Sequence, residues 1–118
     1  MVAAFREAGV PLFVSYYRRY LPKFQTVREI LRSGELGAIT SIDYRLSKRL
    51  RKGDWRLSPA ICGGGQFYDL SGHVLDLFDD WFGPLTFTGG SASNSVPLHD
   101  AEDAVSISFT TPDGAVGS

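Results

Sequence analysis

Two acidic residues and a histidine occur at helical spacing near the middle of the chain. Asp69 and His73 are four residues apart and Asp76 follows one turn later, so on a helix the three side chains share one face. A histidine titrates near neutrality and can accept a proton from a substrate hydroxyl, while a neighbouring carboxylate can orient the ring or bind a second hydroxyl. The pattern therefore predicts acid–base chemistry on this face. The same spacing is also typical of a solvated helix face, and both interpretations stand on spacing alone.

Three glycines at positions 63–65 directly precede this helix. Bare backbone amides at a helix N-terminus can bind an anion such as a phosphate. The run lacks both the G-x-G-x-x-G spacing of dinucleotide-binding turns and the Lys-Ser/Thr ending of a P-loop. We therefore predict a flexible turn that approaches a ligand or a neighbouring element closely, and no nucleotide site.

Three other groups carry weaker signals. Cys62 lies eleven residues before His73, but no third group completes a nucleophilic arrangement, so we interpret it as a structural residue in a turn. A divalent ion is a further alternative, with ligands from the helix row and from His99, Asp100, Glu102 and Asp103. Because a catalytic zinc normally takes three compactly placed ligands, we predict no metal. The basic run 48–52 contains no aromatic residue to stack on bases, and we predict a solvated loop, with a phosphorylated substrate as the alternative.

Composition excludes several classes of protein. The chain has 118 residues, with 12 Lys and Arg against 13 Asp and Glu, so no global positive field attracts nucleic acid or an anionic membrane. No apolar run approaches the ~20 residues that cross a bilayer, and Arg6 and Glu7 stand where a signal peptide would be apolar. A single cysteine excludes an internal disulfide. We expect a cytoplasmic protein with neither a nucleic-acid nor a membrane partner.

Hydrophobic periodicity predicts an α+β fold, with helices packed on one face of a largely antiparallel open sheet. A helix-favouring N-terminus leads into the apolar run 10–16, which is typical of a buried parallel strand. Helical spacing predicts one helix from Pro22 to about Gly34 and another from residue 66 to Gly83, the latter burying Leu77, Phe78, Trp81 and Phe82. Alternation predicts strands at 41–47, 85–89 and 105–110, and a tight turn at 112–114 begins one more.

The segment 63–83, GGGQFYDLSGHVLDLFDDWFG, resembles the signature of the Gfo/Idh/MocA oxidoreductases, the relatives of glucose-fructose oxidoreductase and inositol dehydrogenase. In that family a glycine-rich turn precedes Asp-x-x-x-His on a helix. The segments 10–19 (VPLFVSYYRR) and 30–39 (ILRSGELGAI) and the tripeptide Asp54-Trp55-Arg56 are similar to further parts of the family, in the same order. The resemblance therefore covers most of the chain.

The resemblance implies hydride transfer between a sugar, cyclitol or related polyol and NAD or NADP. It assigns proton acceptance to His73 and binding of the reacting hydroxyl or its neighbour to Asp69. It places Tyr16 and Arg18 beside the substrate, and Trp55 or Arg19 could also line that pocket.

The resemblance also implies which parts of the family are present. Residues 1–16 would be a remnant of the Rossmann domain and residues 17–118 a partial substrate-binding and oligomerisation domain. The family's G-x-G-x-x-G turn and Glu-Lys-Pro segment are absent from this sequence, and several later strands of the substrate domain are not matched. We therefore expect an inactive fragment with no bound cofactor. We also expect a homo-oligomer formed through sheet contacts, because open sheet edges recruit other chains. The alternative is a non-catalytic α+β ligand-binding or oligomerisation module.

Overall fold

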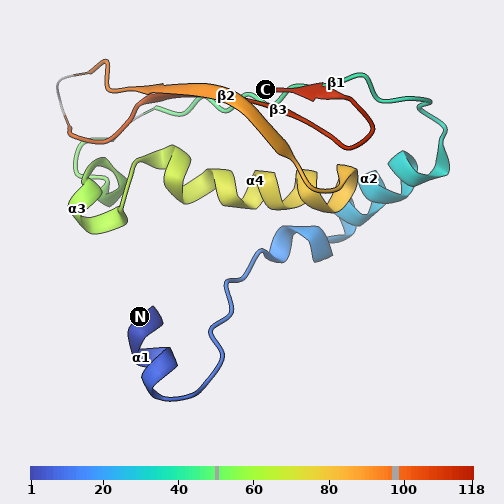
Figure 1. Ribbon diagram of the computed structural model, residues 1–118. Helices are drawn as coiled ribbons and strands as arrows, with labels where there is room; N and C mark the ends of the chain where they lie inside the picture. Colours follow the sequence, from blue (N-terminus) through green and yellow to red (C-terminus); the bar gives the residue numbers. More distant parts are fainter. Residues whose placement is uncertain (50, 97–98) are drawn as a thin grey trace.

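The computed structural model describes residues 1–49, 51–96 and 99–118. Figure 1 shows the sheet on one side and the long helix α4 beneath it, with α2 near one end of α4 and α1 projecting farther away on the side opposite the sheet. The predicted α+β class is confirmed. Within the described residues no helix has both the length and the apolar character needed to cross a membrane.

Two long helices form where the sequence predicts them. Helix α2 spans Pro22–Ser33, starting with a proline whose fixed φ suits the first helical turn and ending at Gly34 with φ 78°. Helix α4 spans Gln66–Phe82 and ends at Gly83 with φ 82°. Short elements complete the helical part, namely α1 (Val2–Glu7), the 3-10 turns η1 (Tyr17–Tyr20) and η2 (Trp55–Leu57), and α3 (Pro59–Cys62). The sequence analysis predicts no helix at the positions of η2 and α3.

The sheet has the strand order β1-β4-β3-β2. Its strands are β1 (Ser41–Ile42), β2 (Thr86–Ser93), β3 (Ala104–Thr110) and β4 (Val116–Gly117). The pairs β2–β3 and β3–β4 are antiparallel, whereas β1 and β4 run parallel, so the sheet is mixed. The β2–β3 register is irregular between Phe87 and Gly89. Strand β2 is longer than the predicted 85–89, because its ladder with β3 continues to Ser93.

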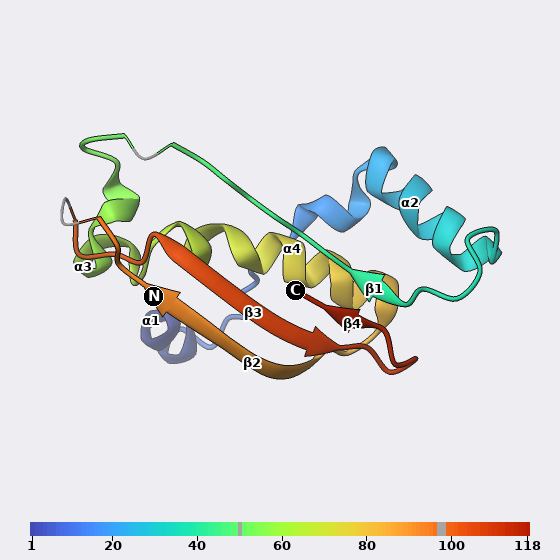
Figure 2. The same cartoon turned by 90° about the horizontal axis from the view of Figure 1, so that it is seen from above.

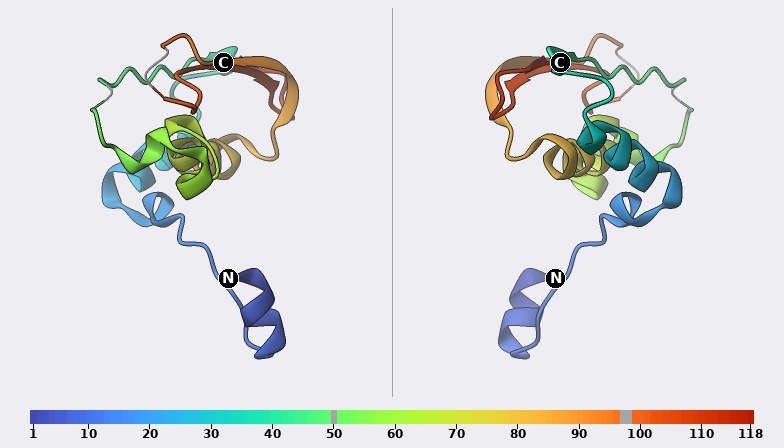
Figure 3. Two further views of the ribbon diagram at one scale, coloured as in Figure 1. Left: turned by 90° about the vertical axis from the view of Figure 1, so that its left-hand side faces the viewer. Right: turned by 90° about the vertical axis from the view of Figure 1, so that its right-hand side faces the viewer.

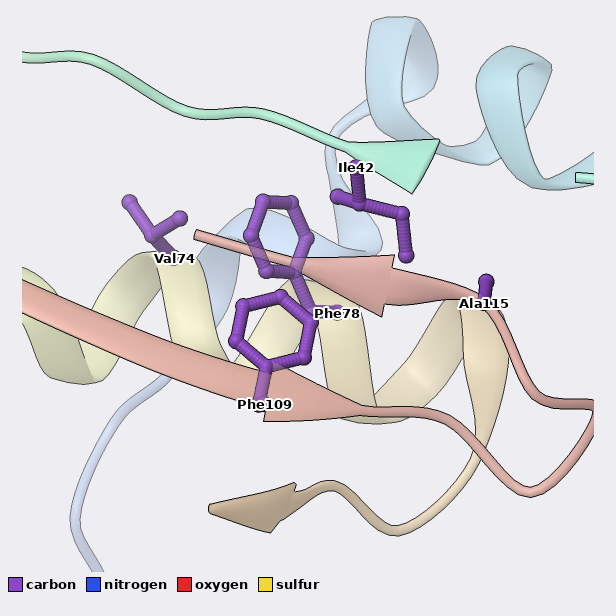
Figure 4. Packing of buried hydrophobic residues seen from close by; sticks show 5 residues of the cluster. All are labelled: Ile42, Val74, Phe78, Phe109 and Ala115. Carbon is purple, nitrogen blue, oxygen red and sulfur yellow. The ribbon is translucent and has the colours of Figure 1, made fainter. Parts of the chain in front are cut away.

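The core lies between the inner face of the sheet and α4. Figure 4 shows its buried side chains, which come from four parts of the chain, Ile42, Val74, Phe78, Phe109 and Ala115. Phe109 is only 2% exposed, and its ring centroid lies 5.8 Å from that of Phe78. Trp81 and Phe82 pack against this cluster, and Leu77 is buried, so the predicted apolar face of α4 is confirmed. Burial of this face orients α4 and points its polar row away from the sheet.

Two predicted strands differ from the structure. Residues 10–16 form no strand with any described residue, and Phe13 and Val14 are 84% and 70% exposed, so the prediction of a buried strand here is wrong. Figure 3 shows α1 and this segment projecting away from the other layers. The predicted strand 41–47 is shortened to β1, because only Ser41 and Ile42 pair with β4. An apolar or alternating sequence favours an extended backbone, but a strand also requires a neighbouring strand as partner for its hydrogen bonds.

Candidate functional site

The polar face of α4 lies opposite the face that covers the sheet. Asp69, His73 and Asp76 lie on this side, and Asp80 continues the row by one turn. Turn η1 and helix α2 pack against the same face. The predicted row of acidic and histidine side chains is therefore partly covered by the N-terminal half of the chain.

His73 packs against two tyrosine rings. The ring centroid of Tyr16 lies 5.8 Å from that of His73 and the centroid of Tyr17 lies 5.5 Å away, both in edge-to-face orientation. Tyr16 also lies against Gly72, where a Cβ atom would come within 3.1 Å of the tyrosine ring. His73 Nδ1 is buried and has no hydrogen-bond partner among the described residues. The imidazole as a whole is half-buried.

Arg19 joins η1 to the polar face of α4. Its guanidinium donates hydrogen bonds to both carboxylate oxygens of Asp76 and, over 3.2 Å, to the backbone carbonyl oxygen of the same residue. The carboxylate oxygen Oδ1 of Asp80 lies 3.8 Å from a guanidinium nitrogen of Arg19 and 3.5 Å from a guanidinium nitrogen of Arg28 of α2. The hydrogen bond to Asp76 raises the pKa of Arg19, which keeps the guanidinium charged. These ion pairs fix the segment that carries both tyrosines.

Asp69 is bound by a residue to which the sequence assigns no role. Arg56 Nε donates a hydrogen bond of 2.6 Å to Asp69 Oδ2, and this bond raises the pKa of Arg56. The Arg56 guanidinium also stacks over the ring of Trp55, 4.3 Å from its centroid. Asp54 begins η2 by accepting a hydrogen bond from the Arg56 backbone N–H, which holds the pKa of Asp54 below its usual value. No hydrogen bond or ion pair joins Asp69 to His73 within the described residues.

Among the candidates from the sequence, the structure brings Tyr16 directly to His73, and it brings Trp55 to Asp69 through Arg56. Arg18 is half-buried and forms no ion pair with any described residue. The residues that sequence reasoning missed are Tyr17 and Arg56. Both adjoin residues that were chosen, but only the geometry of η1 and η2 shows that they contact the row on α4.

The glycine-rich turn is occupied by a carboxylate of the chain itself. Glu102 Oε2 accepts a hydrogen bond of 2.6 Å from the Gly65 N–H, and Oε1 accepts one of 3.4 Å from the Tyr68 N–H. A Cβ atom on Gly65 would lie 2.5 Å from the Glu102 carbonyl oxygen, so the turn needs glycine for this close approach. The Glu102 carboxylate thus neutralises the positive N-terminal end of α4. Because it occupies the backbone N–H group of Gly65, the turn does not fit a dinucleotide phosphate.

The remaining candidates are engaged in local structure. Cys62 Sγ lies 3.3 Å from the carbonyl oxygen of Ser58 and also contacts that of Gly64, which favours its interpretation as a structural residue. Asp103 accepts hydrogen bonds from the backbone N–H groups of Ser95 and Val96, and these lower its pKa. The described part of the chain contains no group of three His, Cys, Asp or Glu side chains that could hold a metal ion. The basic residues on either side of position 50 are exposed, and Leu50 itself lies outside the described residues.

Comparison with known proteins gives consistent matches over most of the chain. It is 31% identical over 114 residues to oxidoreductase P35 of Formosa agariphila, covering 89% of this chain and 36% of that protein. It is 33% identical over 116 residues to D-apiose dehydrogenase of Paraburkholderia graminis, covering 97% of this chain and 30% of that protein.

Solved structures match the fold as well. GenD2 from gentamicin A biosynthesis, in complex with NAD, superposes with a TM-score of 0.73 at 29% identity, covering 98% of this chain and 34% of that chain. The WlbA dehydrogenase from Bordetella pertussis, in complex with NADH and UDP-GlcNAcA, superposes with a TM-score of 0.71 at 27% identity, covering 98% and 37% of the two chains. This chain spans about a third of the length of the relatives it matches.

The model of the GFO/IDH/MocA C-terminal domain matches residues 24–118, which include most of α2, the whole sheet and the helix that carries Asp69 and His73. The fold, the polar row on α4 and this match lead to one assignment. The chain belongs to the GFO/IDH/MocA C-terminal domain family of oxidoreductases.

Proposed function

We propose that this chain supplies the substrate-binding and proton-transfer face of an NAD(P)-dependent oxidoreductase that acts on a hydroxyl group of a sugar, cyclitol or related polyol. The observation that carries the proposal is the half-buried imidazole of His73, packed against Tyr16 and Tyr17 with Nδ1 enclosed. Held in this way, Nε2 accepts the hydroxyl proton of the substrate. NAD or NADP supplies the hydride acceptor when it is bound.

Asp69 and Arg56 bind the substrate beside this histidine. Arg56 takes Oδ2 of Asp69, which leaves Oδ1 to accept a hydrogen bond from the reacting hydroxyl or its neighbour. Trp55 is 46% exposed and presents a ring on which the apolar face of a sugar can pack. Arg18 lies on the same turn as Tyr17 and contributes a polar side chain beside the substrate.

The division of the chain follows from the same proposal. Residues 1–16, which project from the other layers, belong with a dinucleotide-binding domain, and residues 17–118 form part of the substrate domain. Because Glu102 fills the glycine turn, this turn offers no phosphate site, and we expect this chain alone to be inactive and the protein to be cytoplasmic. Exposed residues of the sheet support association with a second copy, since every residue of β2 and alternate residues in the first part of β3 are exposed.

Binding of polyols to the chain itself tests the proposal. Titration with a panel of aldoses and cyclitols should shift the NMR signals of His73 and Asp69, and His73→Phe should abolish the effect. The chain's other histidine provides the matched control, because His99 Nδ1 is bound to the Ala101 carbonyl oxygen and His99→Asn should leave the shifts unchanged.

Two further measurements complete the test. Titration with NAD(H) and NADP(H) should show no tight binding, and light scattering should show a dimer or larger species at tens of micromolar. Shifts confined to residues away from α4, with every polyol tried, would contradict the assignment of the site. Micromolar binding of a dinucleotide would contradict the absence of a phosphate site at the glycine turn.

A further inference from the structure

Four cationic side chains form an open hollow in the connection between β1 and η2. The hollow has a volume of about 480 Å³ and is lined by Lys48, Arg49, Arg51 and Lys52, which we call the basic loop. Figure 2 shows the connection from β1 running along α4 until it reaches α3 near the N-terminal end of α4. No acidic or apolar side chain of a described residue lines this hollow, so its surface is positive throughout.

Neighbouring carboxylates do not balance the charge of the basic loop. Its four side chains are exposed, and none of them forms an ion pair with any residue that the structure describes. The pKa of Asp54 is lowered first by the hydrogen bond from the Arg56 N–H and, to a smaller extent, by the charge of Lys48, so Lys48 lies near this carboxylate. Asp54 Oδ1, however, is already 3.5 Å from Arg56. A cluster of uncompensated positive charge thus stands out in a chain whose net charge is −1.

A tight turn fixes the basic loop directly before η2. The Asp54 N–H donates a hydrogen bond of 3.1 Å to the Arg51 carbonyl oxygen, and Gly53 within this turn has φ 84°, a conformation that favours glycine. Lys52 and Trp55 are three residues apart, so their Cα atoms lie within about 11 Å of each other. The basic loop therefore adjoins the exposed ring of Trp55.

The same segment reaches the polar row of α4. The Asp54 carboxylate contacts the Arg56 guanidinium, and Arg56 Nε donates a hydrogen bond of 2.6 Å to Asp69 Oδ2. Two ionic contacts thus separate the turn that carries the basic loop from the carboxylate to which we assign substrate binding. A ligand held by Asp69 and packed on Trp55 can carry a second, anionic group to the basic loop.

The residue types of the basic loop favour a phosphoryl group over a carboxylate. Two of its cations are arginines, whose planar guanidinium groups bind phosphate oxygens through two parallel N–H donors. A phosphate monoester carries nearly two negative charges at neutral pH and has three acceptor oxygens, so it can engage several cations at once. The segment 48–52 contains no aromatic side chain on which the bases of a nucleic acid could stack. A small phosphorylated ligand therefore fits better than a nucleic acid.

We propose that the basic loop is a phosphoryl-binding site and that the substrate is a phosphorylated sugar or polyol, either a phosphate monoester or a nucleoside diphosphate derivative. The inference rests on the proposed function, because it assigns the sugar part of the ligand to Asp69 and Trp55. Arg49 and Arg51 bind the phosphoryl oxygens, and the two lysines add further positive charge. The basic loop thus selects the substrate and holds it, while the proton passes to His73.

Binding of glucose, glucose 1-phosphate and UDP-glucose to the chain tests this site, with NMR shifts as the readout. At least one of the phosphorylated probes should bind at least about tenfold more tightly than glucose, and this gain should shrink as salt is added. The phosphorylated probe that binds more tightly identifies the monoester or the nucleotide form as the source of the phosphoryl group.

A pair of double variants locates the gain. Arg49→Gln/Arg51→Gln should reduce it to less than about twofold, because the guanidinium donors are lost. The matched control Arg6→Gln/Arg32→Gln removes the same charge from two exposed arginines outside the basic loop and should keep the gain.

Three outcomes would overturn the proposal. Equal affinity for all three probes would show that the phosphoryl group makes no contact, and an equal loss in both double variants would show a long-range effect of net charge. A short single-stranded DNA that binds the basic loop more tightly than either phosphorylated probe would assign the loop to a nucleic acid. Shifts at His73 and Asp69 with glucose, without a gain from phosphate, would overturn this inference alone and leave the proposed function standing.

Discussion

Arg19→Met should loosen the turn that holds the two tyrosines against His73. The guanidinium makes two hydrogen bonds to the Asp76 carboxylate, whose side chain is 11% exposed. Removing the cation leaves this sheltered carboxylate without its partner, at a cost below the 3–5 kcal/mol of fully buried pairs because water still reaches Arg19. We expect the free energy of unfolding to fall by about 2–3 kcal/mol, measured by urea denaturation.

Three further variants isolate the ion pair. Arg18→Met removes the neighbouring cation, which makes no ion pair with any described residue, and should change stability by less than about 0.5 kcal/mol. Arg19→Lys keeps the charge but not the two-pronged geometry and should recover about half of the loss. The double variant Arg19→Met/Asp76→Asn should be more stable than Arg19→Met alone, because no orphaned charge remains. If Arg19→Met and Arg18→Met unfold at the same urea concentration, the ion pair contributes nothing and the reasoning is refuted.

Three other changes test the supports of the site and the core. Glu102→Ala should destabilise the chain by about 1–2 kcal/mol in thermal unfolding, because the Gly65 N–H loses its acceptor, whereas Glu102→Gln should retain most of the stability; equal losses would count against this role. Phe109→Ala should cost about 3–5 kcal/mol, measured by urea denaturation, because the ring is fully buried, and a loss below about 1 kcal/mol would contradict the packing. Asp103→Asn should remove a pH-dependent contribution. Hydrogen bonds from Ser95 lower the folded-state pKa of Asp103 from its ordinary 3.8, so its stabilisation is present above pH 4 and is lost as the pH falls through the lower folded value. The two proteins should therefore converge in stability in acid, and a difference that stays constant down to about pH 2 would contradict this linkage.

Local patterns predicted the long helices and the polar row. Helix α2 has a proline at its start and Gly34 at its end, and the apolar positions of α4 repeat with the helical period, so residues close in sequence determine both. The row from Asp69 to Asp80 follows from the same period. These features need no information about the rest of the chain.

Contacts between distant segments could not be predicted in this way. Whether residues 10–16 form a strand depends on a partner, which their apolar character does not supply. Arg56 reaches Asp69 across 13 positions and Glu102 reaches Gly65 across 37, and no spacing rule connects such pairs. The structure therefore identifies the partners of the site residues. It shows that Asp69 is bound by the guanidinium of Arg56 and not by His73.

The bond between Glu102 and the first turn of α4 also has a consequence for the order of folding. The helix that carries His73 begins at a turn of three glycines, which disfavour helix formation in an isolated segment. Its stabilising carboxylate comes from the connection between β2 and β3, 37 residues further along the chain. During synthesis from the N-terminus, we therefore expect the first turn of α4 to stay frayed until residue 102 has emerged and the β2–β3 hairpin has closed.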